Sequence, residues 1–278
     1  MLATVGHAVL GPWDEPIMRR AFLEIVLLGI AGGALGCWVV FYNLSYSAES
    51  LAHSLLPGLV IAALLGLPLL LGGAAGLLVA ALAVAAAGRT PAIGRDTAVA
   101  VVITTLFGLG VLLALSPASP AGLQGLLFGD VLGVTDTDLA LAAGLVAVVA
   151  VALRALHGRL LVVGFDRVNA PGLGVSPALV DGALLILLAL ALLVAVQGLG
   201  NLLVVAVLIA PAAGARLLTR RMGHMLGLAA ALAASAGIAG LYLSYYAGTA
   251  AGASIAGMLV AVYALVGLAR ATGLTPGT

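Results

Sequence analysis

The stretch that decides the fold lies at residues 178–218 and reads ALVDGALLILLALALLVAVQGLGNLLVVAVLIAPAAGARLL. Its only charged residues are Asp181 near the start and Arg216 near the end. A helix that crosses the hydrocarbon core of a bilayer needs about 20 apolar residues. Because the stretch is long enough for two such helices, it predicts consecutive membrane spans at 178–198 and 200–218.

The whole chain shares this composition. Of its 278 residues, 64% are hydrophobic and only 8% are charged, and the mean hydropathy is +1.29. A membrane barrel is excluded because its strands would alternate polar and apolar residues, whereas these runs are continuous. Helices are the remaining way to satisfy backbone hydrogen bonds in lipid. We therefore predict an all-α, polytopic membrane helical bundle of about eight or nine transmembrane helices.

The distribution of charge predicts the sides of the membrane. All eleven basic residues are arginine, and the formal net charge of +1 gives no indication of nucleic acid as a partner. Cytoplasmic connections of membrane proteins are rich in Arg and Lys. Arginines occur in the connections 89–95, 154–167 and 216–221 but not in 116–137 or 244–251. The first three connections are therefore expected to be cytoplasmic, and the other two to face outward.

The first ninety residues leave two topologies open. Three spans before Arg89 would put Arg19 and Arg20 outside, whereas two would keep them inside. The expected organisation is an N-terminal cytoplasmic or interfacial segment at 1–20, a transmembrane domain at 21–270 and a tail at 271–278. The remaining apolar runs lie at 21–41, 52–72, 73–88, 97–115, 138–157, 222–243 and 252–270.

Glu49 and His53 are polar residues where the chain enters its second apolar run. Four residues apart on a helix, they share one face. A carboxylate in mid-membrane costs roughly 2.5–3.5 kcal/mol, so it normally faces a partner or a wet cavity. Carboxylate and imidazole are ligands suited to zinc or manganese. By spacing alone, a salt-bridged pair, a metal contact and a proton relay all remain open.

Catalytic motifs are absent from the sequence. A P-loop needs a lysine on the phosphates, and this chain contains no lysine. There is also no Cys-x-x-Cys, His-Glu-x-x-His or Gly-x-Ser-x-Gly. The chain is therefore expected not to be an enzyme, and to bind no permanent cofactor. Cys37, the only cysteine, is expected to be a small hydrophobic residue that faces either lipid or the protein core.

One cytoplasmic connection, at about 158–177, is longer than a turn requires. Residues 160–170 are expected to form a short helix, which Pro171 and Gly172 end. A compact polar segment of this kind is a candidate docking element, although an ordinary solvated loop has the same composition.

Several segments, read in order, resemble the membrane permease of ATP-binding-cassette importers for zinc, manganese and iron. The resemblance covers approximately residues 20 to 265. It rests on Glu49-Ser-Leu-Ala-His53-Ser, Asp96-Thr-Ala-Val, Leu106-Phe-Gly-Leu-Gly110, Leu127-Phe-Gly-Asp130 with Asp138 after it, Phe165-Asp166, Gly200-Asn-Leu-Leu-Val with Pro211-Ala-Ala-Gly-Ala-Arg216-Leu-Leu, and Ser244-Tyr-Tyr246. The chain departs from the family pattern at Glu49, where an aspartate is usual, and at Ala52, where a serine is usual.

The resemblance implies a function and a set of partners. Two copies of the chain would form the pathway in the cytoplasmic (inner) membrane, in contact with membrane lipid. A separate cytoplasmic ATPase would bind ATP and dock on Phe165, Asp166, Arg167, Ala170 and Gly174. A periplasmic or surface metal-binding protein would dock on the outward loops. Glu49 and His53 would be transient ligands of the ion, with zinc expected first and manganese or iron as alternatives.

Two rival functions belong to other classes. In a secondary transporter driven by protons or sodium, Glu49 and His53 would form a proton relay. In a membrane scaffold that does not transport, changing both residues would leave function intact.

Overall fold

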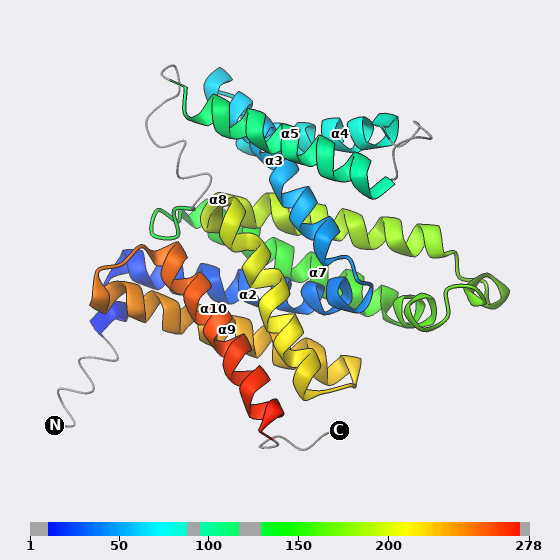
Figure 1. Cartoon of the computed structure of the whole chain (residues 1–278). Coiled ribbons are helices and arrows are strands. Elements are labelled where there is room, and N and C mark those ends of the chain that lie inside the picture. The colour runs from blue at the N-terminus through cyan, green and yellow to red at the C-terminus, as the bar shows by residue number, and fades with distance from the viewer. Residues whose placement is uncertain (1–10, 88–94, 117–128, 273–278) are drawn as a thin grey trace.

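The computed structural model describes residues 11–87, 95–116 and 129–272, which form a bundle of helices (Figure 1). No strand occurs within these ranges. The described elements, in chain order, are α2 (Pro16–Phe41), α3 (Ser45–Leu65), α4 (Leu69–Ala87), α5 (Arg95–Ala114), α7 (Asp136–Phe165), the short 3-10 helix η1 (Ala170–Leu173), α8 (Pro177–Leu218), α9 (Met222–Ala247) and α10 (Ala251–Ala271).

The helices confirm the membrane bundle that the composition predicts. Six helices of the described chain are long and apolar enough to cross a membrane. Three shorter apolar helices lie at Leu69–Val84, Val99–Ala114 and Leu203–Leu218. Together they correspond one to one with the apolar runs of the sequence. With the shorter helices counted, the described chain is approximately consistent with the expected eight or nine transmembrane helices.

α8 contains two of these apolar helices because its backbone breaks at Gly200. The backbone there has φ 73° and ψ 164°, far from helical values. Glycine adopts this conformation without the steric cost that a Cβ atom would bring. The decisive apolar stretch therefore forms two apolar helices, as the sequence predicts: Pro177–Asn201, which is long enough to span a membrane, and the shorter Leu203–Leu218.

α2 lies at the centre of the bundle and contacts α7, α8 and α9. Its large side chains Phe22, Leu35 and Trp38 are fully buried. Its glycines allow the neighbouring backbones to approach closely, as small residues do in membrane helices. A Cβ atom at Gly33 would lie 2.8 Å from the Ala229 carbonyl oxygen of α9, and one at Gly36 would overlap the Leu208 carbonyl of α8.

α3, α4 and α5 form a separate layer, at the top of Figure 1. α3 packs against α4 and α5 and also contacts α8, so it joins this layer to the rest of the bundle. Leu55 and Leu59 of α3 are fully buried and belong to the main hydrophobic core. The start of α3, which carries Glu49 and His53, is therefore held between the two parts of the molecule.

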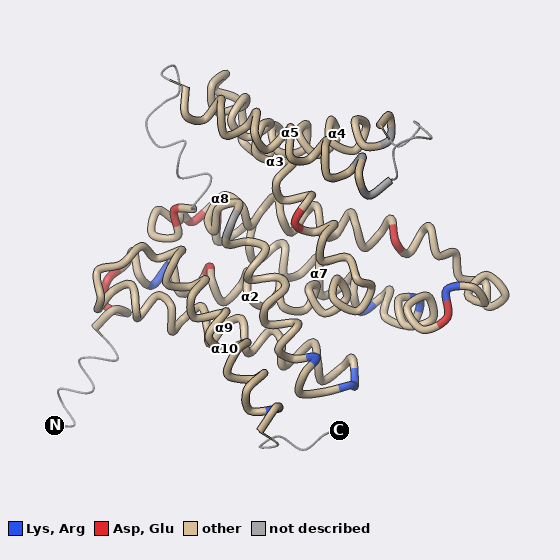
Figure 2. The backbone as a smooth tube through the Cα atoms, viewed as in Figure 1, with Lys and Arg blue, Asp and Glu red and all other residues tan. Residues whose placement is uncertain are grey.

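The two ends of the bundle differ in charge. At one end, Arg216 Nη1 donates to the Val40 carbonyl at 3.5 Å, and Arg270 donates to the Leu217 carbonyl. We call this the arginine end, and most described basic residues gather toward it (Figure 2). At the opposite end, Arg20 and Asp136 form an ion pair at 3.0 Å.

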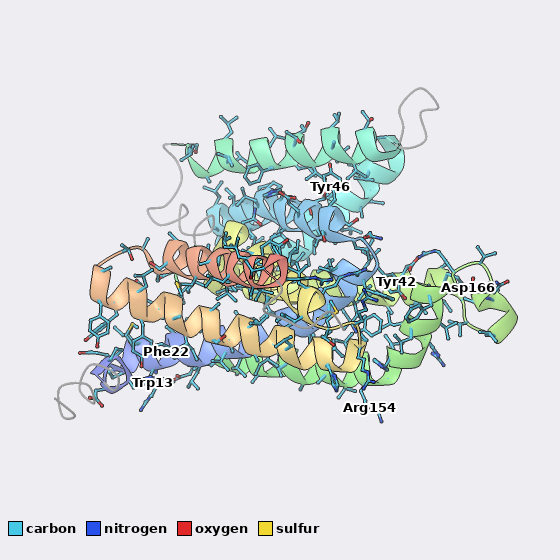
Figure 3. The ribbon with its side chains drawn as sticks, turned by 60° about the horizontal axis from the view of Figure 1, so that its bottom comes forward. Trp13, Phe22, Tyr42, Tyr46, Arg154 and Asp166 are labelled. Carbon is cyan, nitrogen blue, oxygen red and sulfur yellow. The ribbon has the colours of Figure 1, made fainter. Side chains whose placement is uncertain are left out.

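Aromatic residues also mark the end opposite the arginine end. Trp13 Nε1 donates to the Tyr242 hydroxyl at 2.8 Å, and the ring of Trp13 stacks on Phe22 with centroids 4.5 Å apart. Figure 3 shows Trp13 and Phe22 far from Asp166, which lies in the connection after α7. α2 therefore starts at the end opposite the arginine end, and α7 runs parallel to it.

Candidate functional site

Glu49 and His53 share one face at the start of α3, as the sequence predicts. His53 Nε2 lies 3.8 Å from Glu49 Oε1. The Glu49 side chain is 57% exposed and the His53 side chain only 23%. The pair therefore presents a carboxylate at the surface of this chain, with an imidazole directly behind it.

A third polar residue, Asn201, joins this pair from the break in α8. Asn201 Nδ2 lies 3.2 Å from His53 Nδ1, across 148 residues of sequence. Asn201 is fully buried, and its Oδ1 has no hydrogen-bond partner among the described residues. The opposite face of the imidazole packs near Phe107 of α5, with ring centroids 4.5 Å apart. These contacts fix the position of the His53 ring.

The orientation of the Asn201 amide and the tautomer of His53 depend on each other. With Nδ2 donating, His53 Nδ1 is the acceptor and Nε2 is protonated. Rotation of the amide by 180° would bring the unpartnered Oδ1 against Nδ1 and place the proton there. Nε2 would then offer its lone pair beside Glu49 Oε1. A hydrogen bond to the other nitrogen is how proteins commonly orient a metal-binding histidine.

These three residues open onto a pocket of about 550 Å³ between α3, α8 and α10. Its other walls are apolar or aromatic, and they include Val205, Ile209 and Tyr263. A small hydrated cation fits this volume, whereas the walls offer little else for a polar organic molecule to bind. The chemistry of the pocket therefore lies in its three polar residues.

The donor set of a single chain is incomplete as a metal site. No group of three or more His, Cys, Asp or Glu side chains that could hold a metal occurs within the described ranges. Glu49 and His53 supply one oxygen and one nitrogen donor, and manganese and zinc take more ligands than these two. Any further ligands would come from water, from the unpartnered Asn201 Oδ1 or from another chain.

The segment after α7 exposes apolar side chains at the arginine end. Phe165 is 78% exposed, Val168 87% and Leu173 71%. Arg167 forms an ion pair with Asp181 at the start of α8, and Ala170 is fully buried. Gly174 ends η1 with φ 72°. The connection is thus folded against α8 and presents an apolar surface.

Asp166 organises the first turn of this connection. It accepts hydrogen bonds from the Asn169 side chain at 2.7 Å and from the Asn169 backbone N–H at 3.1 Å. These hydrogen bonds, the side-chain one first, hold the pKa of Asp166 below its usual range. Asp166 therefore shapes the loop, while the exposed Phe165 and Val168 are available to a partner.

The expected short helix at 160–170 is wrong in its position. α7 continues unbroken through Phe165, and the short helix is η1, with Pro171 in its first turn. Arginine is a good helix former, so Arg159 does not end α7, and the helix continues through the apolar residues that follow Arg159. Proline starts η1 because the first helical turn needs no N–H from it.

The sequence predicted the Glu49–His53 pair but gave no role to Asn201. The available signal was a polar residue next to Gly198 and Gly200 in an apolar run. Its partner could not be read from the sequence, because it depends on where the break in α8 crosses α3.

Comparison with known proteins gives a consistent result over almost the whole chain. A family model described as the ABC 3 transport family matches residues 14–270. The chain is 33% identical over 236 residues to the manganese transport system membrane protein MntC of Listeria monocytogenes, a match that covers 84% of each chain. It is 32% identical over 238 residues to a probable iron transport system membrane protein of Haemophilus influenzae, covering 86% of this chain and 88% of the relative.

A solved structure shares the fold. PsaBC from Streptococcus pneumoniae, in complex with a Fab, matches with a TM-score of 0.87 and 28% identity. The match covers 94% of this chain and 95% of the PsaBC chain. The arrangement of helices described above is therefore that of a known type of membrane protein.

Proposed function

The chain belongs to the ABC 3 transport family, and we propose that it is the permease through which an ATP-binding-cassette importer carries manganese(II). It is a multi-pass membrane protein of a transport family, and the proposal assigns ATP hydrolysis to a separate subunit. The observation that supports a metal pathway is the Glu49–His53–Asn201 cluster, which opens onto a pocket between three membrane helices.

Manganese is preferred to zinc because relatives are named as manganese or probable iron transport proteins. The donors themselves do not separate the two ions, since carboxylate suits manganese and imidazole suits zinc. Zinc, the first expectation from the sequence, remains a prediction to be tested beside manganese. Iron stays the second alternative.

A second copy of the chain would complete the pathway. Glu49 is more than half exposed on one chain, which suits a carboxylate that faces its symmetry mate across a shared channel. Two copies would offer two oxygens and two nitrogens to the ion. We therefore keep the homodimer as part of the proposal.

The arginine end is assigned to the cytoplasm by the positive-inside rule. The ATPase would dock there, on the segment of about 158–177 that includes Phe165, Asp166, Arg167, Ala170 and Gly174. A periplasmic or surface metal-binding protein would dock at the opposite end. Since α2 starts at that opposite end, we propose that its first residues, Pro16 to Arg20, lie at the outer side, whereas the sequence alone predicted a cytoplasmic or interfacial segment.

The test is metal uptake into proteoliposomes that contain the chain with its ATPase and its binding protein. We expect ATP-dependent accumulation of radiolabelled manganese to fall about tenfold or more in Glu49→Ala and His53→Ala, because each change removes a ligand. Matched controls are Glu15→Ala and His224→Ala, which remove the same residue types from exposed positions and should transport normally.

Three results would contradict the proposal. Unchanged uptake in both site variants would remove these residues from the pathway. Zinc accumulated in preference to manganese would reverse the choice of ion. Uptake driven by a proton or sodium gradient without the ATPase would favour a secondary transporter.

A further inference from the structure

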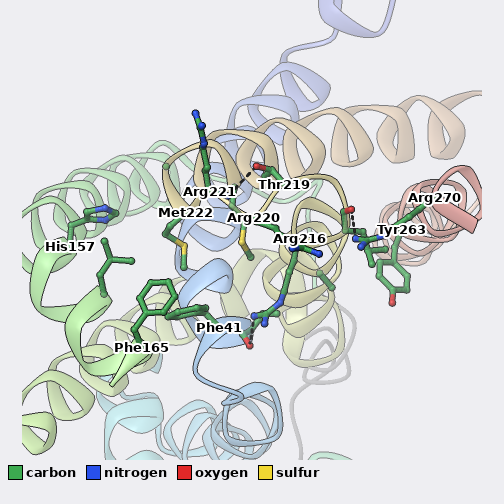
Figure 4. Close-up of a pocket in the computed structure, with 16 residues that line it drawn as sticks. Phe41, His157, Phe165, Arg216, Thr219, Arg220, Arg221, Met222, Tyr263 and Arg270 are labelled. Carbon is green, nitrogen blue, oxygen red and sulfur yellow. Dashed lines mark hydrogen bonds between the residues drawn. The ribbon is translucent and has the colours of Figure 1, made fainter. Parts of the chain in front are cut away.

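A second pocket, of about 830 Å³, lies at the arginine end and is separate from the Glu49–His53 site (Figure 4). The ends of α2, α7, α8 and α10 and the start of α9 enclose it. Four arginines line it, and no Asp or Glu does. The arginines are Arg216, Arg220, Arg221 and Arg270. We call it the arginine pocket.

Two of these arginines have structural partners. Arg216 donates to the Val40 carbonyl at 3.5 Å, and Arg270 donates to the Leu217 carbonyl. Both carbonyls lie near the ends of helices, where a cation is favourable. The guanidinium carbon of Arg216 also lies 5.9 Å from the centroid of the Phe41 ring. Hydrogen bonding to carbonyls at helix ends is enough to explain the positions of Arg216 and Arg270. These bonds still leave most of the N–H donors of the two guanidinium groups unused.

Arg220 and Arg221 have no such explanation. They follow Thr219 in the short connection between α8 and α9, and both are exposed. Neither side chain makes a hydrogen bond or ion pair with the part of the chain that the structure describes. Four like charges around one pocket repel each other, so an anion between them would be stabilised. The pocket therefore has the electrostatics of an anion site.

The remaining walls identify the kind of anion. Phe41, Phe165, Met222 and Tyr263 give the arginine pocket a largely apolar lining. A free inorganic anion gains nothing from these side chains, whereas the glycerol and upper acyl chain of a phospholipid would pack on them. Guanidinium groups bind phosphate oxygens through two parallel hydrogen bonds. Basic pockets between membrane helices on the cytoplasmic side are typical sites for anionic headgroups.

We propose that the arginine pocket binds the phosphate of an anionic phospholipid from the cytoplasmic leaflet. Arg220 and Arg221 bind the phosphate, while Arg216 and Arg270 form the fixed wall behind it. The acyl chains leave the pocket along the aromatic and methionine side chains. Because Phe165 lines the pocket and also belongs to the surface offered to the ATPase, bound lipid would steady that surface.

The experiment measures the thermal unfolding midpoint of the full chain, purified in a nonionic detergent, during titration with phosphatidylglycerol. We expect a saturable rise with wild type and none with phosphatidylcholine. The double variant Arg220→Gln/Arg221→Gln should need roughly ten- to thirtyfold more phosphatidylglycerol for the same rise. Arg154→Gln/Arg159→Gln is the matched control, since it removes the same charge from exposed positions of α7 outside the pocket. The control should respond as wild type does.

Other outcomes would overturn the proposal. An equal loss in both double variants would mean that the lipid binds to surface charge in general. The same saturable rise with inorganic phosphate alone would make the pocket a free-phosphate site. If the Arg220→Gln/Arg221→Gln variant kept its lipid response but no longer bound the ATPase in nanodiscs, the pocket would belong to the protein partner instead.

Discussion

At the scale of single residues, helical spacing predicted part of the site and could not predict the rest. Glu49 and His53 are four residues apart, so local geometry alone brings them to one face of α3. Asn201 reaches His53 only because Gly200 breaks α8 at the level of that face. Contacts between distant segments depend on how helices cross, and a hydropathy pattern does not contain that information.

The hydrogen bond from Asn201 should matter for transport although Asn201 is not an expected ligand. Asn201→Leu removes the only polar partner of His53 Nδ1 in the described structure, so the ring and its proton are no longer positioned. We expect the apparent KM for manganese in the uptake assay to rise roughly ten- to a hundredfold, the range found for residues that orient metal ligands. The matched control is Gln197→Leu, one turn earlier on α8. A wild-type KM in Asn201→Leu would contradict the positioning role.

At the scale of helices, each apolar run of the sequence corresponds to an apolar helix of the structure, but the runs did not predict every helix end. The run at 138–157 became α7, which spans Asp136–Phe165. Hydropathy marks where a helix leaves the lipid, whereas the helix itself continues until a residue such as Asp166 or Pro171 interrupts it. Glycines at four-residue spacing in α2, such as Gly29 with Gly33 and Gly32 with Gly36, are typical of closely packed membrane helices. Only the structure shows that Gly33 faces α9 and Gly36 faces α8.

Substitution of Gly36 should damage the packing of α2 on α8. A Cβ atom there would overlap the Leu208 carbonyl, which is backbone and cannot move aside as a side chain could. We expect Gly36→Ala to lower the free energy of unfolding by about 1–3 kcal/mol, as overpacking of a core does. Thermal unfolding in detergent measures the effect. Gly144→Ala is the control, because a Cβ atom at Gly144 of α7 would have no neighbour within 4 Å. Equal midpoints for the two variants would mean that α2 and α8 lie farther apart than described.

At the scale of the whole molecule, the number of spans and the orientation of the chain are linked. The sequence could not choose between two and three crossings before Arg89. Residues 66–76 contain four glycines and Pro68, so it was open whether the apolar runs on either side were separate full spans. In the structure, Gly66 is in the left-handed conformation and ends α3, and α4 begins at Leu69. Three long helices, α2, α3 and α4, therefore lie among the described residues before residue 88. With the arginine end placed in the cytoplasm, as proposed above, α2 would start outside and α10 would end inside.

The wild-type chain is suited to a cysteine-labelling test of this orientation. Cys37 is the only cysteine, and it is fully buried. Its Sγ lies 3.2 Å from the Gly33 carbonyl and 3.5 Å from the Met225 carbonyl, to which it donates. A membrane-impermeant maleimide should therefore leave the wild-type protein unlabelled. Glu15→Cys and Val168→Cys each introduce one exposed thiol, at opposite ends of the bundle.

In right-side-out spheroplasts, we expect Glu15→Cys to react with the maleimide and Val168→Cys to react only after the membrane is permeabilised. This result requires an odd number of crossings between the two positions, as α2, α3, α4, α5 and α7 provide. Reaction of both residues from outside would require an even number, and one of these helices would then not span the membrane. Reaction of Val168→Cys alone would show that the orientation is the reverse of the one proposed. The surface around Phe165 would then face away from any cytoplasmic ATPase.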